Sequence, residues 1–251
     1  MSNSNNILLL GGITEARLLL EKINSITGFN VVYSTKTSIG PSLQYCTQRF
    51  GGFGGIDGLE AYLAHEAIGL IIDCTHPYAA QISNHAFAAS QHLTIPYLQY
   101  LRPAWDFSYN KLTCIDSFIQ LHTVLEKSQR IFFTIGEQQK TFIASKPVEQ
   151  IWWWRSAVEL NIPEKIDNFT SMVQRGPFSY ADELSFLKNN KVDTLVCKNS
   201  GGQSVFAKIQ AAMDLKIDIV MLARPPVVQH EFLFTNITAL ASKLKSYRST
   251  N

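Results

Sequence analysis

The chain has 251 residues, of which 46% are apolar, and its formal net charge is +2. This length is sufficient for one large or two small domains with a proper core. The small net charge argues against a protein that coats nucleic acid. No apolar run reaches the roughly 20 residues of a membrane span, and the polar segment 1–6 lacks the pattern of a secretory signal.

The four cysteines lie far apart in the sequence, and none belongs to a C-x-x-C motif. The six histidines show no spacing typical of metal ligands. We therefore expect neither a metal site nor a disulfide framework. The predicted location is the cytoplasm, with neither nucleic acid nor a membrane as a partner. The sequence leaves the oligomeric state open and is compatible with a monomer.

After the polar segment 1–6 comes an apolar run, residues 7–10, followed by two glycines and a segment typical of a helix. An uninterrupted apolar run predicts a strand buried on both faces, as in parallel sheets. Thr14 is a candidate cap for the helix, and Glu15 lies in its first turn. Free N–H groups at a helix start favour phosphate. Gly11 and Gly12 therefore indicate either a nucleotide-binding loop or only a tight turn.

A second strand, expected at residues 29–33, is followed by Ser34, Thr35 and Lys36. In NAD-dependent dinucleotide-binding folds, an acidic residue usually follows this strand and holds the ribose 2′-hydroxyl. Here hydroxyls and a lysine take its place, which suits a 2′-phosphate and favours NADPH over NADH. The alternative is a solvated loop that contains a lysine by chance.

Residues 49–55 contain four glycines and predict a loop that either bends tightly or contacts a ligand. A helix at 58–66 and a strand at 70–74 are expected next. Thr75 and His76 come directly after this strand, where ligands bind in open α/β sheets. His76 has an alternative interpretation as a helix-capping or structural residue.

The second half of the chain repeats the pattern of the first. Gly11 and Gly136 are 125 residues apart, and Arg102 and Arg224 are 122 residues apart. Each glycine follows an apolar run, and each arginine precedes a proline. Several matching motifs are separated by nearly the same number of residues, which indicates an internal repeat.

The repeat predicts an α/β protein with two Rossmann-like domains, each built on a mainly parallel sheet. We place the domains at 1–128 and 129–251, joined near residues 127–129. A cleft between two such domains is the default ligand site. The pyrophosphate of a dinucleotide is expected in the first domain, because Gly136 has no second glycine beside it.

Lys198 comes at the end of an apolar strand and precedes the segment Asn199-Ser200-Gly201-Gly202. A lysine there needs a partner, because an unpaired ammonium is costly to bury. We expect Lys198 to supply a positive charge or a proton, with the segment as a second anion site. The alternative is a structural lysine paired with a nearby carboxylate such as Asp193.

Arg102 and Arg224 occupy matching positions of the two halves. Guanidinium groups suit carboxylates and phosphates, so both are candidates for binding an anionic ligand. The alternative is a pair of structural salt bridges between the domains. The run Trp152-Trp153-Trp154 either lines a planar ligand or is an ordinary core strand, and we favour the core strand.

Five motifs in this order together resemble the precorrin-6A reductase family of cobalamin biosynthesis. They are Leu9-Leu10-Gly11-Gly12-Ile13-Thr14-Glu15-Ala16, Arg49-Phe50-Gly51-Gly52-Phe53-Gly54-Gly55, Asp73-Cys74-Thr75-His76-Pro77-Tyr78-Ala79, Arg102-Pro103-Ala104-Trp105 and Lys198-Asn199-Ser200-Gly201-Gly202. The chain departs from the family pattern at Ile13, Cys74 and Tyr78, where threonine, alanine and phenylalanine are usual. None of these departures removes a proposed polar contact.

The resemblance implies an NADPH-dependent oxidoreductase that acts on a CH–CH bond. A hydride would reach a methylated tetrapyrrole and saturate its C18=C19 bond, with a proton added at the neighbouring carbon. The substrate would be metal-free precorrin-6A or its cobalt complex, which is converted to the corresponding precorrin-6B. Positively charged side chains would face the acetate and propionate arms of this tetrapyrrole.

The resemblance also assigns roles to residues of this chain. Lys198 would be catalytic, with His76 as the second candidate. The cofactor would bind Gly11, Gly12, Thr14, Glu15, Ser34, Thr35, Lys36, Gly52, Phe53 and Thr75. The substrate would bind Arg49, Arg102, Asn199, Ser200, Gly201 and Arg224.

Two other functions remain open. One is a two-domain protein that closes on an anionic small molecule without turnover, although the missing secretory signal counts against a periplasmic carrier. The other is an NADP-linked reductase of a different substrate, which the motifs alone do not exclude. Consumption of NADPH separates the first of these from a reductase.

Overall fold

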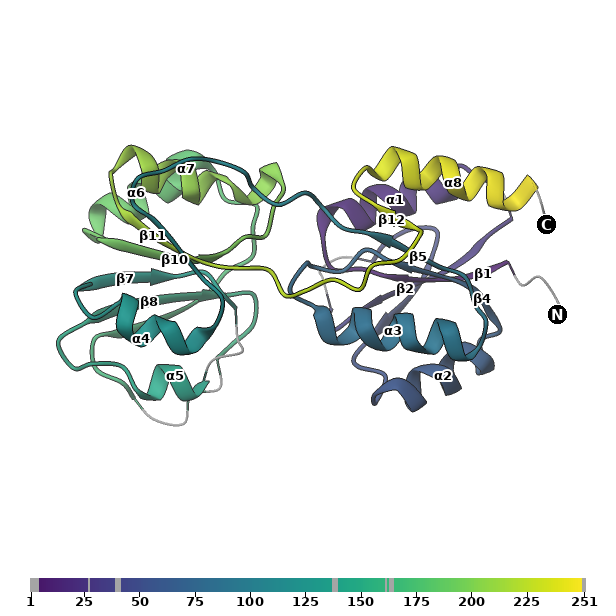
Figure 1. Ribbon diagram of the computed structural model, residues 1–251, viewed down its shortest axis with the longest axis horizontal. Helices are drawn as coiled ribbons and strands as arrows, with labels where there is room; N and C mark the ends of the chain where they lie inside the picture. The colour runs from purple at the N-terminus through teal and green to yellow at the C-terminus, as the bar shows by residue number, and fades with distance from the viewer. Residues whose placement is uncertain are drawn as a thin grey trace. The chain divides into compact units, whose positions relative to one another are not determined.

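The computed structural model describes residues 5–26, 28–38, 42–136, 140–160, 162 and 165–249. The chain forms two compact units. Unit 1 consists of Met1–Pro103 and Pro225–Asn251, and unit 2 consists of Ala104–Arg224. Each unit is a six-stranded parallel sheet with helices on both faces, which confirms the predicted α/β class (Figure 1). Within the described ranges, no helix has the length and apolar character needed to cross a membrane.

The sheet of unit 1 has the strand order β12-β5-β4-β1-β2-β3. Its strands are β1 (Asn6–Leu10), β2 (Asn30–Thr35), β3 (Thr47–Phe50), β4 (Ile68–Asp73), β5 (Tyr97–Tyr100) and β12 (Leu233–Phe234). Its helices are α1 (Thr14–Asn24), α2 (Ile56–His65), α3 (Ala80–His92) and α8 (Ile237–Ser249).

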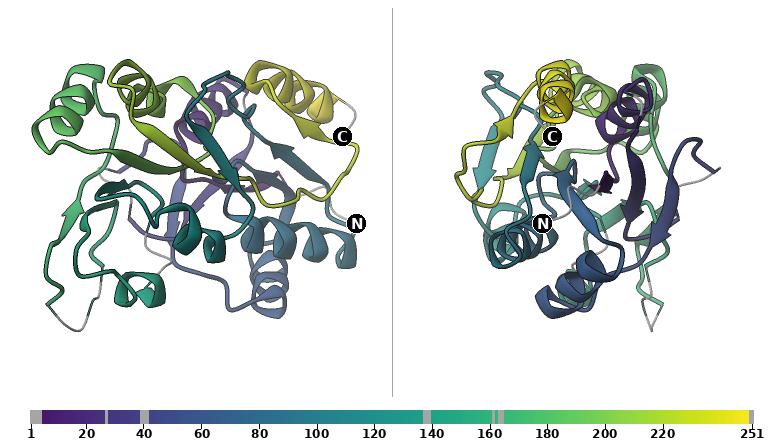
Figure 2. Two further views of the ribbon diagram at one scale, coloured as in Figure 1. Left: turned by 60° about the vertical axis from the view of Figure 1, so that its left-hand side comes forward. Right: turned by 90° about the vertical axis from the view of Figure 1, so that its right-hand side faces the viewer.

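Helices α1 and α8 cover one face of this sheet, and α2 and α3 cover the other, as both views of Figure 2 also show. Leu9 and Ile72 pack into the core beneath α1 and α8. Leu8 and Ile71 point to the opposite face and pack beneath α2 and α3. Successive residues of a strand face opposite sides, so a sheet covered on both faces needs apolar residues at every position. This explains the uninterrupted apolar runs.

The sheet of unit 2 has the order β6-β11-β10-β7-β8-β9. Its strands are β6 (Leu112–Ile115), β7 (Arg130–Phe133), β8 (Ile151–Ser156), β9 (Phe169–Val173), β10 (Thr194–Lys198) and β11 (Asp218–Leu222). Its helices are α4 (Leu121–Val124), α5 (Lys140–Ala144), α6 (Tyr180–Asn189) and α7 (Ala207–Asp214), with the short 3₁₀ segments η1 (Phe118–Gln120) and η2 (Gln203–Val205).

The tryptophan run lies on β8 and belongs to the core of unit 2. Trp152 and Trp154 are buried and pack against the ring of Phe133, with centroid distances of 4.6 Å to each. Trp153 points to the other face and packs near Phe186. The interpretation of this run as a core strand is confirmed.

The two sheets have the same topology, which supports the internal repeat. Strands β7 to β11 occupy the positions that β1 to β5 occupy in unit 1, and β6 occupies the position of β12. These two outer strands are exchanged between the halves of the sequence. Strand β6 comes before residue 128 and pairs with β11, whereas β12 comes from the second half and pairs with β5.

The predicted division after residue 128 is therefore not the division of the fold. The chain passes between the units after Pro103 and again after Arg224. The repeat in the sequence marks equivalent strands correctly. It contains no information on which sheet receives a short outer strand, because strand pairing depends on contacts between distant residues.

Local predictions differ from the structure at three places. Thr14 is the first residue of α1, and the capping position, Ile13, provides no side-chain hydrogen bond. Arg49 and Phe50 belong to β3 rather than to the glycine loop. Helix α2 begins at Ile56, earlier than expected, because the loop ends at Gly55.

Candidate functional site

The turn after β1 leaves open space beside its backbone. At Gly11, a Cβ atom would lie 2.3 Å from Cζ of Tyr33, so packing of this ring requires glycine. At Gly12, φ is +121° and an added Cβ would meet no atom within 4 Å. The Gly12 N–H donates a long hydrogen bond, 3.4 Å, to the Tyr33 hydroxyl. Strand β1 lies between β4 and β2, where the strand order reverses and ligands bind in such sheets.

Two predicted site residues meet beside this turn. Arg102 follows β5, and its Nη2 donates to Oε2 of Glu15 at 2.6 Å. The Arg102 side chain is 5% exposed and that of Glu15 is 19% exposed. The pair fixes the first turn of α1 to the carboxyl end of the sheet. The Arg102 charge is thus partly neutralised by Glu15 within unit 1.

The residues at the end of β2 divide into inward and outward side chains. Ser34 and Thr35 are buried. The Ser34 hydroxyl accepts from Arg49 at 3.4 Å, and the Thr35 hydroxyl donates to the Thr37 carbonyl at 2.8 Å. Lys36 is exposed. Of these three predicted cofactor residues, Lys36 has the position that suits contact with a charged group in solution.

Arg49 holds the glycine loop. Its guanidinium donates to the carbonyls of Gly51 at 2.7 Å and Gly52 at 2.8 Å, and it lies 3.6 Å from the ring centroid of Phe53. These contacts indicate a structural role, and the predicted contact of Arg49 with substrate stays a prediction. An added Cβ at Gly52 would meet no atom within 4 Å, so this backbone is open to a ligand.

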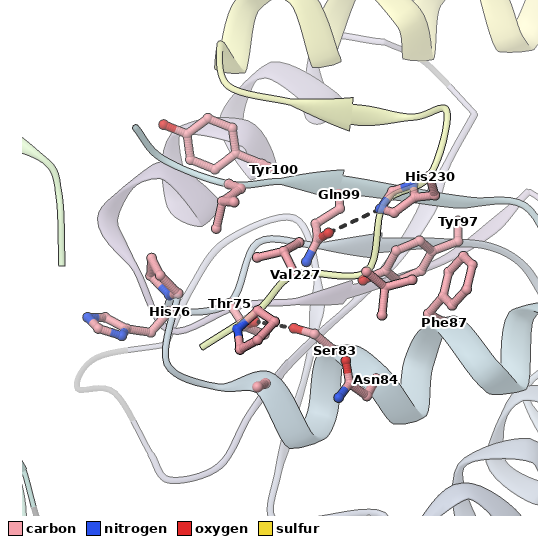
Figure 3. Close-up of a pocket in the computed structure, with 15 residues that line it drawn as sticks. Thr75, His76, Ser83, Asn84, Phe87, Tyr97, Gln99, Tyr100, Val227 and His230 are labelled. Atoms are coloured by element: carbon pink, nitrogen blue, oxygen red, sulfur yellow. Dashed lines mark hydrogen bonds between the residues drawn. The ribbon is translucent and has the colours of Figure 1, made fainter. Parts of the chain in front are cut away.

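Thr75 and His76 line a narrow pocket of about 20 Å³ at the carboxyl ends of β4 and β5 (Figure 3). The hydroxyls of Thr75 and Ser83 lie 3.1 Å apart. The His76 Nδ1 accepts from the Tyr78 N–H at 3.3 Å. A volume of this size holds about one water molecule, so the pocket suits a polar group and not a ring.

A chain of hydrogen bonds runs through the wall of this pocket. The buried Asp73 carboxylate accepts from the Tyr97 hydroxyl at 2.7 Å and from the Gln99 amide at 3.2 Å. The Gln99 Oε1 lies 3.1 Å from Nε2 of His230. An amide oxygen only accepts, so this arrangement assigns the imidazole proton to Nε2. Burial lowers the pKa of His230, which favours the neutral ring.

Gln99 and His230 are not among the predicted site residues, but they line this pocket together with Ser83 and Asn84. His230 lies 131 residues from Gln99, in a segment without regular structure. One signal was available: Gln99 is a polar residue in an otherwise apolar strand. No motif indicates His230.

In unit 2, Lys198 is the last residue of β10 and faces the turn after β7. A Cβ added to Gly136 would lie 3.9 Å from its Nζ. Burial lowers the pKa of Lys198 from 10.5 to about 8. Asp193 precedes β10 and accepts from the N–H groups of Gln129 and Arg130. The two side chains lie at opposite ends of the strand, so the alternative pairing of Lys198 with Asp193 is wrong.

The segment after Lys198 is held by its own unit. The Asn199 side chain accepts from the Trp105 N–H at 2.9 Å and donates to the Trp105 carbonyl at 3.3 Å. The Arg224 Nε donates to the Asn199 carbonyl at 2.8 Å. Ser200 is buried, and Gly201 has a φ of +65°. The Asn199 and Arg224 contacts are structural, and the predicted contacts of these residues with substrate stay predictions.

No group of three or more metal-ligating side chains occurs among the residues that the structure describes. The four cysteines are free thiols, and burial raises the pKa of Cys74 and Cys197. The buried thiols therefore stay protonated and are poor nucleophiles. The polar groups that the structure places around these turns and pockets are open backbone, hydroxyls, imidazoles and cations.

Comparison with known proteins identifies the family of this chain. The family model "Precorrin-6x reductase CbiJ/CobK" matches residues 6–245. A precorrin-6A reductase of Sinorhizobium sp. is 34% identical, over 87% of this chain and 84% of its own length. A precorrin-6A reductase of Mycobacterium tuberculosis is also 34% identical, over 87% and 88%.

A cobalt-precorrin-6A reductase of Priestia megaterium is 26% identical, over 88% of this chain and 91% of its own length. A solved structure named "CobK precorrin-6A reductase" superposes with a TM-score of 0.86 and 28% identity, covering 96% of both chains. The match thus extends over the sequence and the fold of both units. The chain belongs to the precorrin-6x reductase family.

Proposed function

We propose that this chain is an NADPH-dependent reductase that converts precorrin-6A to precorrin-6B in cobalamin biosynthesis. The observation that carries the proposal is the family match over residues 6–245, together with 34% identity to precorrin-6A reductases. Identity to the cobalt-precorrin-6A reductase of Priestia megaterium is lower, at 26%, and this favours the metal-free macrocycle as substrate.

The turn after β1 fits a dinucleotide phosphate. Gly12 presents backbone with no neighbouring atom where a side chain would lie. The helix start that follows adds the positive end of its dipole. When bound, NADPH supplies the hydride. Lys36, exposed directly after β2, is the proposed partner of the ribose 2′-phosphate.

Lys198 is the proposed catalytic residue. Hydride addition to a conjugated macrocycle leaves extra electron density on it until the neighbouring carbon takes a proton. A cation held in a poorly solvated position stabilises this density strongly. With its pKa near 8, Lys198 is also able to release a proton at neutral pH. His76 is the second candidate for the proton donor.

The test is the loss of absorbance at the reduced-nicotinamide band, with purified protein, precorrin-6A and either NADPH or NADH. We expect loss that depends on precorrin-6A and is much faster with NADPH. Activity only with the cobalt complex would assign the cobalt form as substrate. Binding of the tetrapyrrole in a fixed ratio without any consumption of NADPH would contradict the reductase and favour a binding protein.

A further inference from the structure

Unit 2 contains a cavity of about 190 Å³ that the proposed roles above do not use. It lies at the carboxyl ends of β7, β8 and β9, and α6 and the start of α7 contribute to its walls. Its walls include Thr134, Arg155, Gln174, Phe178, Glu183 and Lys208. A cavity of about 150 Å³ holds a benzene molecule, so this one is large enough for a carboxyalkyl group.

Two buried charged side chains in the wall have hydrogen-bonding atoms without a partner. The Arg155 Nη1 donates to the Glu183 Oε1 at 2.6 Å, with side chains 9% and 2% exposed. Within the described part of the chain, Nε of Arg155 and Oε2 of Glu183 are buried and make no hydrogen bond. A buried polar atom that stays unsatisfied is unfavourable. An occupant that accepts a hydrogen bond would satisfy the Arg155 Nε–H, though not the Glu183 oxygen.

The charges of the wall do not balance. Arg155 and Glu183 neutralise each other, and Lys208 adds a further cation near both. Burial is the main cause that lowers the pKa of Lys208; Cys197 and Glu183 oppose this shift, and Arg155 adds to it. A buried net positive charge is unfavourable, and a carboxylate in the cavity would compensate it.

The internal repeat gives this cavity a defined place in the fold. Strands β7, β8 and β9 occupy the positions of β1, β2 and β3. The cavity thus corresponds in unit 2 to the region of unit 1 that has the Gly11–Gly12 turn and the glycine loop. Unit 1 offers open backbone there. Unit 2 offers charged side chains and the Phe178 ring, which lies 4.0 Å from the Arg155 guanidinium.

We propose that this cavity binds a carboxylate arm of the tetrapyrrole substrate, with Lys208 as its counter-ion and the Arg155 Nε–H as a hydrogen-bond donor. The identity of the tetrapyrrole rests on the proposed function, whereas the preference for a carboxylate rests on the cavity. Glu183 holds Arg155 in place through the ion pair.

The test measures binding without turnover. All four tryptophans, at positions 105, 152, 153 and 154, lie in unit 2, so their fluorescence reports on this unit. Precorrin-6A is titrated into the protein in the absence of NADPH, and quenching by the tetrapyrrole gives Kd. We expect Lys208→Met to raise Kd about ten-fold or more, since a charge-assisted hydrogen bond is lost. Lys208→Arg, which keeps the charge, should recover most of the affinity.

The matched control is Lys188→Met, at an exposed lysine of α6, which should leave Kd within about two-fold. Thermal unfolding of each variant establishes that it is folded. In the turnover assay, Lys208→Met should raise KM for precorrin-6A and leave KM for NADPH and kcat nearly unchanged. A positioning role elsewhere in the fold would not give this pattern.

Several outcomes would overturn the inference. One is an unchanged Kd in folded Lys208→Met, and another is the absence of quenching by precorrin-6A in the unmodified protein. A third is binding of free propionate that depends on Lys208 while precorrin-6A binding does not. Lys208-dependent binding of precorrin-6A without NADPH oxidation would contradict the proposed function and leave this inference supported.

Discussion

Glu15 and Arg102 form an ion pair with a nitrogen–oxygen distance of 2.6 Å, although 87 residues separate them in the sequence. Glu15 lies in the first turn of α1, directly after the turn proposed to hold the cofactor phosphate. Arg102 follows β5. The pair therefore connects the proposed cofactor-binding turn after β1 to the residues just before the chain passes into unit 2.

Removal of one partner should destabilise the protein. Arg102→Met leaves the mostly buried Glu15 carboxylate without its cation, and we expect the free energy of unfolding to fall by about 3 kcal/mol. Urea denaturation measures the change. The control is Arg17→Met, at an exposed position of the same helix, with an expected change within about 0.5 kcal/mol. Equal stability of both variants would contradict a structural role for the pair.

Gly11 and Gly12 should respond differently to alanine. Gly11→Ala forces a Cβ into the Tyr33 ring and should lower the melting temperature. Gly12→Ala meets no neighbour but imposes a side chain at a φ of +121° and covers open backbone. We expect it to weaken NADPH binding ten-fold or more, measured by the fluorescence of bound NADPH. Undiminished affinity in Gly12→Ala would place the phosphates elsewhere.

Lys36→Glu should shift the coenzyme preference toward NADH. The exposed side chain has little influence on folding, so the melting temperature should not change. Repulsion between the new carboxylate and the 2′-phosphate should lower kcat/KM for NADPH about ten-fold, with NADH unaffected or improved. The ratio of the two kcat/KM values is the measurement. An unaltered ratio would exclude Lys36 as the 2′-phosphate partner.

We expect Lys198 to make both the stability and the turnover of the protein depend on pH, in opposite directions. Burial lowers its pKa from 10.5 to about 8, so between these pH values the unfolded chain binds a proton that the folded protein lacks. Stability from this group therefore rises with pH from about 8 to 10.5, and the burial penalty is complete below pH 8. Lys198→Met should remove this dependence and unfold at a higher temperature at pH 7. Differential scanning calorimetry at several pH values measures both effects.

Turnover should show the opposite trend. If the Lys198 ammonium stabilises charge or donates a proton, kcat falls as the pH rises through about 8. Lys198→Ala should keep its affinity for NADPH and lose most turnover. Lys198→Arg keeps a charge at every pH and should remove the decline near pH 8. An unchanged kcat in Lys198→Ala would exclude this residue from the chemistry.

Local patterns in the sequence determined the building blocks of this protein. The apolar run before Gly11, the tryptophan run of β8 and the position of Lys198 at a strand end follow from residues adjacent in the chain. Burial on both faces of a parallel sheet leaves a pattern that neighbouring residues reveal. The repeat was visible for the same reason, because equivalent strands keep similar neighbours.

Only the tertiary structure decided which segments meet. In the fold, β6 from the first half of the sequence joins the sheet of unit 2, and β12 from the second half joins the sheet of unit 1. The tertiary structure joined His230 to Gln99, and Arg155 to Glu183 beside Lys208. It also showed that Arg49 and Asn199, predicted to bind ligands, hold loops. Hydrogen bonds and ion pairs between distant residues have no periodic signal in the sequence, since each depends on one pair of side chains that folding brings together.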